Sequence, residues 1–333
     1  MAKKKKMTKK KRHFLRKMLL LLLILIVLFV VLCFISPKED EMTEISSSGK
    51  IENLEIPSRV DWDQIIKHTG YTLSYNEEYE LANWVAYELT REEVLGPGSR
   101  EDSFKTDPAV KTGSATLDDY KKSGYDRGHL APAADFKWSA EAMSDTFFMS
   151  NMSPQAPDFN RGIWSDLEAV VRTMAYDNGS VYVATGPVLT DGPYETIGKN
   201  KVAIPKRFYK VVLDYTDPDI KAIGFVLPNE GSDKPLQSFA TTIDEVEEIT
   251  GIDFFPALPD DIEERLESAY DASKWSFRLF VPTGETADVE YVAPETSNAS
   301  LVKDKIMEVL YEMKKAVFSY TGTTKFAREL GLI

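Results

Sequence analysis

The chain has 333 residues, of which 43% are hydrophobic and 28% are charged. This is the composition of ordinary globular protein, with room for one large domain or two small ones. The net charge is −13, but residues 1–17 hold ten Lys or Arg, so the other 316 residues hold 30 basic and 53 acidic side chains, a net −23. Such an acidic bulk favours solubility and repels anionic partners at long range.

The N-terminus is predicted to cross a membrane. After the basic tail, residues 18–35 are eighteen consecutive apolar residues, which as a helix would reach ~27 Å, near the hydrocarbon thickness of a bilayer. The run ends without a small-residue cleavage site, so an uncleaved signal anchor over 18–36 is favoured over a cleaved signal peptide. By the positive-inside rule, residues 1–17 are a cytoplasmic tail. We therefore expect a single-pass protein of the cell membrane, with the lipid bilayer as a partner of residues 18–36 and the larger part on the extracytoplasmic side.

The cysteine content excludes several chemistries. Cys33 is the only cysteine and lies in the apolar run. The remainder of the chain therefore has no disulfide, no thiolate nucleophile and no cysteine-based zinc site. Residues 37–66 are charged and contain Ser and Gly, which is typical of a stalk or linker.

The following residues alternate between short apolar strands and a few helices. Their order predicts an α+β fold with an antiparallel sheet rather than a doubly wound one. A second linker and an amphipathic helix are expected within 293–333. The predicted strands are 71–75, 83–89, 180–185, 208–215 and 220–227, and the predicted helices are 158–177, 242–249 and 260–270.

Histidine is the first candidate for catalysis. Only three histidines occur, and His13 lies in the basic tail. His68 has no obvious catalytic or ligand partner nearby in sequence, so a surface or packing role is favoured for it. His129 follows Asp126, Arg127 and Gly128. Because an imidazole titrates near neutral pH, His129 is the candidate general base.

A helix with a metal ligand is predicted after this stretch. In the helix 158–177 we expect Asp158 as the N-cap, with Asn160 near the start and Glu168 eight residues later, ~12 Å apart along a straight axis. Asn160 would thus bind an ion directly and Glu168 through a water molecule. So few protein ligands suit Mg²⁺, although Asn160 alone is also explained as a helix-capping amide.

Arg127 is two residues before His129, so on a strand both side chains leave the same face. A fixed guanidinium beside a base suits hydrolysis of a phosphate ester, because it stabilises the charge that grows on the phosphate. Considered alone, Arg127 is equally explained by a salt bridge to Asp126.

The combined motif resembles the DNA/RNA non-specific endonucleases. These are ββα-metal nucleases, similar to secreted sugar-non-specific nucleases and mitochondrial endonuclease G. The resemblance is carried by the Asp-Arg-Gly-His run that ends at His129, by Asn151, and by Asn160 eight residues before Glu168. It covers roughly residues 67–282, and we place the nuclease domain at 67–292.

The resemblance implies a role for each residue. His129 would be the general base, and Asn160 would bind a single Mg²⁺ or Mn²⁺. Glu168 would orient metal-bound water, and Asn151 would support the site by hydrogen bonding. Phosphate contacts are implied for Arg127 and Arg100, and the exposed cations that could add affinity include Arg161.

The function predicted from the sequence is therefore a membrane-anchored, magnesium-dependent endonuclease acting on DNA, RNA or both. The alternative is a catalytically silent nucleic-acid-binding or envelope module that has kept the nuclease fold, which the acidic charge favours. A third hypothesis is an enzyme with the same hydrolytic chemistry whose substrate is another phosphodiester.

Overall fold

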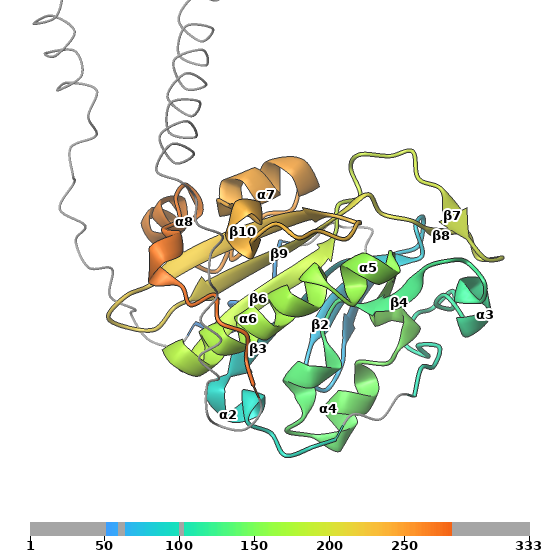
Figure 1. Cartoon of the computed structure of the whole chain (residues 1–333), viewed down its shortest axis with the longest axis horizontal. Coiled ribbons are helices and arrows are strands. Elements are labelled where there is room, and N and C mark those ends of the chain that lie inside the picture. Colours follow the sequence, from blue (N-terminus) through green and yellow to red (C-terminus); the bar gives the residue numbers. More distant parts are fainter. Residues whose placement is uncertain (1–50, 59–63, 100–102, 282–333) are drawn as a thin grey trace, which may run out of the picture. The chain divides into compact units, whose positions relative to one another are not determined.

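The structure is a computed structural model that describes residues 51–58, 64–99 and 103–281. Seven strands form one sheet in the order β1-β2-β3-β6-β9-β10-β11, and all its neighbouring pairs are antiparallel. This confirms the predicted α+β fold with a central antiparallel sheet (Figure 1). The sheet strands are β1 Gln64–Lys67, β2 Thr72–Asn76, β3 Leu81–Thr90, β6 Ser180–Pro187, β9 Arg207–Asp214, β10 Lys221–Pro228 and β11 Ala240–Thr241.

Two short ladders and the helices complete the fold. The signal anchor predicted at 18–36 and the helix predicted within 293–333 lie outside the described residues. The ladders pair β4 Asp126–His129 with β5 Met152–Gln155, and β7 Thr196–Ile197 with β8 Val202–Ala203. The helices are α2 Arg91–Val94, α3 Leu117–Tyr120, α4 Ala140–Asp145, α5 Pro157–Asn160, α6 Ile163–Asn178, α7 Ile243–Thr250 and α8 Asp260–Glu267, with 3₁₀ helices η1 Ala133–Phe136, η2 Met149–Asn151, η3 Leu236–Phe239 and η4 Ala272–Lys274.

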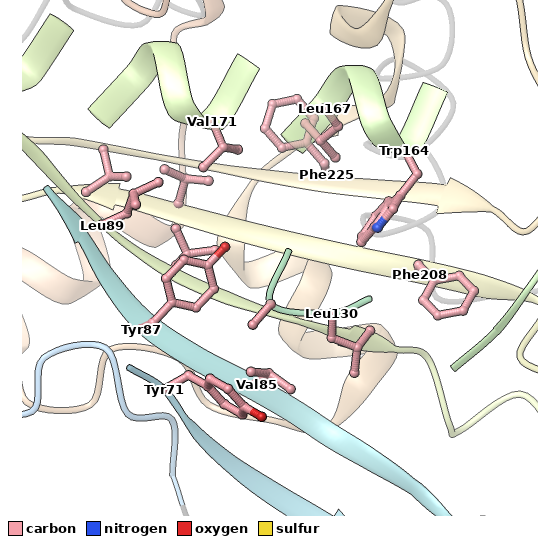
Figure 2. Close-up of a cluster of buried hydrophobic side chains, with 14 of the residues drawn as sticks. Tyr71, Val85, Tyr87, Leu89, Leu130, Trp164, Leu167, Val171, Phe208 and Phe225 are labelled. Carbon is pink, nitrogen blue, oxygen red and sulfur yellow. The ribbon is translucent and has the colours of Figure 1, made fainter. Parts of the chain in front are cut away.

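Helix α6 packs on one face of the sheet. Its apolar residues recur at helical spacing, so Trp164, Leu167 and Val171 share one side and are buried. Figure 2 shows these side chains pointing from the helix toward Phe208 and Phe225 of the sheet. Since burying an aromatic or aliphatic side chain of this size contributes about 1.5–3 kcal/mol, the packing fixes α6 against the strands.

The opposite face of the sheet is covered by α7. Successive side chains of a strand leave opposite faces, so Gly224 points away from the face that carries Phe225. A Cβ at Gly224 would lie only 2.8 Å from Val246 of α7. The strand thus approaches α7 closely because this position has no side chain, and α7 and α8 lie together over β10 (Figure 1).

The predicted helix 158–177 is divided into two helices, α5 and α6. The break falls at Gly162, whose φ of −110° and ψ of −116° are not helical, and a Cβ there would lie 2.5 Å from the Asp158 carbonyl oxygen. The predicted N-cap Asp158 is wrong, because Ala156 precedes α5, which begins with Pro157. The predicted C-terminus is correct, since α6 ends at Asn178 before a glycine with a φ of +95°.

Candidate active site

A polar cavity of about 500 Å³ opens where β4 meets α5 and α6. Four residues singled out in the sequence meet at its wall, namely Arg127 and His129 from β4, Asn160 from α5 and Glu168 from α6. Arg161, predicted to contact substrate, also lines it. The complete lining is Arg127, His129, Pro132, Ala133, Ala134, Asn160, Arg161, Ser165, Glu168 and Arg172.

Strand β4 sets the positions of Arg127 and His129. It pairs antiparallel with β5, with His129 opposite Met152, and its alternation directs both side chains to the cavity, as predicted. Gly128 between them faces the other way, where a Cβ would lie 2.1 Å from the buried side chain of Gln155. A larger residue at Gly128 would therefore push β4 away from β5.

Aromatic rings hold the side chains of His129 and Arg127 in place. The Phe104 ring lies 4.2 Å from the Arg127 guanidinium carbon and 5.7 Å from the His129 ring centroid. Phe147 makes an edge contact with His129, with centroids 5.0 Å apart. The Trp164 indole N–H donates to the His129 carbonyl oxygen at 3.4 Å, which ties β4 to α6. His129 is only 8% exposed.

Asp126 organises the far side of the cavity. Its carboxylate accepts a hydrogen bond from Asn160 Nδ2 at 3.0 Å and two from the Arg161 guanidinium at 2.8 and 2.7 Å. Burial raises the pKa of Asp126, but the hydrogen bonds from Arg161 and Asn160 outweigh it and hold the pKa below its ordinary value. The salt bridge considered for Arg127 is thus formed by Arg161 instead.

These contacts bear on metal binding. Because Asn160 donates through its amide nitrogen, its amide oxygen is the atom left to act as a ligand. The Glu168 carboxylate lines the same cavity from the next helix, α6. Amide and carboxylate oxygens are the donors that Mg²⁺ and Mn²⁺ take, so these residues fit the ion that the family resemblance implies.

Asn151 lies behind the site and is fully buried. Its Oδ1 accepts from the Ala131 backbone N–H at 2.9 Å, and its Nδ2 donates to the carbonyl oxygens of Ala131 and Thr146 at 2.9 and 2.8 Å. Both ends of the amide are therefore bonded to backbone, that of Ala131 just after β4 and that of Thr146 just after α4. Asn151 is not among the residues that line the cavity.

One cation of the cavity, Arg172, was not predicted from the sequence. Arg172 lines the cavity and donates to Asp135 at 2.9 Å, while Tyr87 donates to the other oxygen of that carboxylate. Arg172 lies four residues after Glu168 on α6, which places both on one side of the helix. This spacing is the feature of the sequence that could have predicted Arg172 as a cavity residue. Lys210, which from the sequence is one of the cations that could bind nucleic acid, is instead fully buried, with Nζ 4.8 Å from the Trp164 ring, and it does not line the cavity.

Arg100 and His68 are two further residues considered from the sequence. Arg100 lies outside the described residues. His68 is a packing histidine whose side chain is 7% exposed. Its ring stacks on Phe148 with centroids 4.7 Å apart, and its Nε2 lies 2.9 Å from Asp107, a partner that sequence proximity did not reveal.

Comparison with known proteins identifies the chemistry. Residues 49–261 match the family model of the DNA/RNA non-specific endonucleases. The chain is 33% identical over 273 residues to the mitochondrial nuclease EXOG of Danio rerio, covering 74% of this chain and 80% of the relative. It is 38% identical over 209 residues to the mitochondrial endonuclease G of Homo sapiens, covering 59% and 70%. A chain of the crystallised EndoG/EndoGI complex superposes with a TM-score of 0.58 at 33% identity, covering 64% and 95%.

These relatives correct the predicted location. Both curated relatives are named as mitochondrial proteins, so the prediction of a single-pass cell-membrane protein with an extracytoplasmic domain is wrong. Among residues 51–58, 64–99 and 103–281, no helix has the length and apolar character needed to cross a bilayer. That prediction rests on residues 1–36 alone, namely on the apolar run, the basic residues before it and the missing cleavage site.

Proposed function

The chain belongs to the DNA/RNA non-specific endonuclease family and is a hydrolase of phosphodiester bonds, and from this premise we propose that the cavity around His129 is its catalytic site. Its substrate is DNA, RNA or both, and its ion is Mg²⁺ or Mn²⁺. The observation that carries the proposal is the convergence of His129, Arg127, Asn160 and Glu168 on one polar cavity.

His129 acts as the general base. Its neutral imidazole takes one proton from a water molecule, and the water oxygen attacks phosphorus as the opposite P–O ester bond breaks. The leaving oxygen gains a proton, so the products are a phosphate monoester and a hydroxyl group. The tight packing of His129 between Phe104 and Phe147 keeps the ring in one orientation for this step.

Positive groups around the cavity hold the phosphate. Arg127 lies next to His129 on β4, and Arg161 and Arg172 line other parts of the wall. The Asn160 oxygen and, through a water molecule, Glu168 would hold a Mg²⁺ or Mn²⁺ ion, which when bound would supply further charge stabilisation to the phosphate. These local cations explain how an acidic domain engages a polyanion, with affinity that falls as salt rises.

Asn151 is a positioning residue in this scheme. Its hydrogen bonds to Ala131 and Thr146 fix the backbone that leaves β4 directly after His129. It would act on the rate through the position of His129 and not by touching the substrate.

The proposal is tested by digestion of plasmid DNA and of RNA with Mg²⁺, with Mn²⁺ and with excess EDTA. We expect cleavage with either ion, none in EDTA, and a loss of about 10²- to 10⁴-fold in rate for His129→Ala. Asn160→Ala should abolish the metal-dependent rate while the protein stays folded.

A matched control separates the two histidines of the domain. The wild-type cleavage rate should fall at acid pH as the imidazole of the base protonates. The His68→Gln variant should show the same fall in rate at acid pH, the acid limb of the pH profile, because His68 is bonded to Asp107 away from the cavity. Near wild-type cleavage by His129→Ala, or an acid limb lost in His68→Gln, would refute the assignment.

A further inference from the structure

Three carboxylates gather on the other side of the sheet, on α7 and α8. Asp244 and Glu247 belong to α7, and Glu267 ends α8. Each offers one ligand oxygen, and these atoms all lie within 4.8 Å of one another. None of the three lines the catalytic cavity, so the group is separate from the proposed active site.

A second observation concerns the burial of the Glu267 carboxylate. The residue is 7% exposed, and its Oε1 is a buried atom with no hydrogen-bond partner within the described part of the chain. Glu247, by contrast, accepts a hydrogen bond from the Phe254 backbone N–H at 2.7 Å. A buried carboxylate oxygen without a donor is costly. The Glu267 carboxylate also has its ligand oxygen within 4.8 Å of those of Asp244 and Glu247, so a cation between the three would offset this cost.

We propose that Asp244, Glu247 and Glu267 bind a divalent cation of the calcium class at the junction of α7 and α8. Oxygen atoms on opposite sides of one ion are separated by twice the metal–oxygen distance, about 4.8 Å for Ca²⁺ and about 4.2 Å for Mg²⁺. Three ligand oxygens no more than 4.8 Å apart can therefore all contact one Ca²⁺ ion. The exposed position of Asp244 leaves room for the water ligands that complete six to eight oxygens.

The charge around the group agrees with this assignment. Burial, together with the neighbouring carboxylates of Glu247, Glu263, Asp244 and Asp253, raises the pKa of Glu267 to about 9. Burial likewise raises the pKa of Glu247 to about 7. Such mutual repulsion is relieved by a cation. Because the ion would join two helices that both pack on β10, its role would be to stabilise this layer.

The test is calorimetric titration of the full chain with CaCl₂ at pH 8. The chain carries Asn160→Ala, so that the proposed catalytic ion does not contribute. We expect one Ca²⁺ per chain and a rise in Tm on the order of 5 °C when calcium greatly exceeds its Kd. Adding Glu267→Gln should weaken calcium binding by at least about 10-fold. Asp244→Asn, at an exposed position, tests the same site if the buried substitution impairs folding.

The matched control is Glu263→Gln, which removes a nearby carboxylate that is not in the trio and should leave calcium binding intact. Absence of both binding heat and a Tm shift in the Asn160→Ala chain would overturn the proposal. So would binding that survives Glu267→Gln and Asp244→Asn, or that weakens equally in Glu263→Gln, because a diffuse acidic surface would then explain it.

Discussion

Replacement of Asn151 by alanine separates a positioning role from a catalytic one. The substitution leaves the Ala131 N–H and the Ala131 and Thr146 carbonyl oxygens without their partner, in a place with no solvent access. Each lost hydrogen bond costs about 1 kcal/mol, and more when the remaining group stays buried and unpaired. We therefore expect the free energy of unfolding to fall by about 3–5 kcal/mol.

The assay for Asn151→Ala combines urea unfolding with cleavage rates measured well below the melting temperature. The expected result is the loss of stability together with a lower rate per folded molecule, because the backbone after His129 loses its anchor. A destabilisation below about 1 kcal/mol would refute the reasoning from these hydrogen bonds. An unchanged stability with abolished cleavage would instead indicate that Asn151 contacts the substrate.

Further predictions concern the charged side chains of Asp126, Lys210 and Glu267. Asp126→Ala removes the acceptor of the Asn160 amide, so the Mg²⁺ concentration for half-maximal cleavage should rise about 10- to 100-fold. Lys210→Met should raise the free energy of unfolding by about 1–3 kcal/mol in urea, because an unpaired buried charge is replaced by an apolar side chain. Burial lowers the folded pKa of Lys210 to about 8, so wild-type stability should rise between pH 8 and the unfolded value of about 10.4, a slope that Lys210→Met removes. The raised pKa of Glu267 has the opposite effect: calcium-free protein should lose stability as pH rises from about 4.3 toward 9, and this loss should be smaller in Glu267→Gln.

Much of the site could be predicted because its signals are local. The alternation of a strand places Arg127 and His129 on one side, and the sequence shows this directly. Residues 158–177 are predicted as one continuous helix, but α5 begins at Pro157 and the break between α5 and α6 falls at Gly162. A single straight helix predicts a separation of ~12 Å between Asn160 and Glu168 along its axis. In the structure these residues lie on two separate helices, α5 and α6.

Lys210 could not be predicted because its environment is built from distant segments. In the sequence it is one cation inside an otherwise apolar strand, which is usually an exposed position. In the structure it faces Phe225 across the β9–β10 pairing and lies against Trp164 of α6. Only the order of strands in the sheet and the position of α6 bury it, and neither is a local property of residues 208–215.

The three arginines of the cavity differ in how much charge they present to a phosphate. Arg161 is bonded to Asp126, and Arg172 is bonded to Asp135, so a carboxylate already balances each of them. Arg127 rests on the Phe104 ring, and within the described residues its Nε has no hydrogen-bond partner. A guanidinium held by an aromatic face keeps its N–H donors for an incoming anion. In the proposed reaction, Arg127 is therefore the cation best placed to bind the phosphate that the water activated by His129 attacks, while the two paired arginines chiefly fix the wall of the cavity.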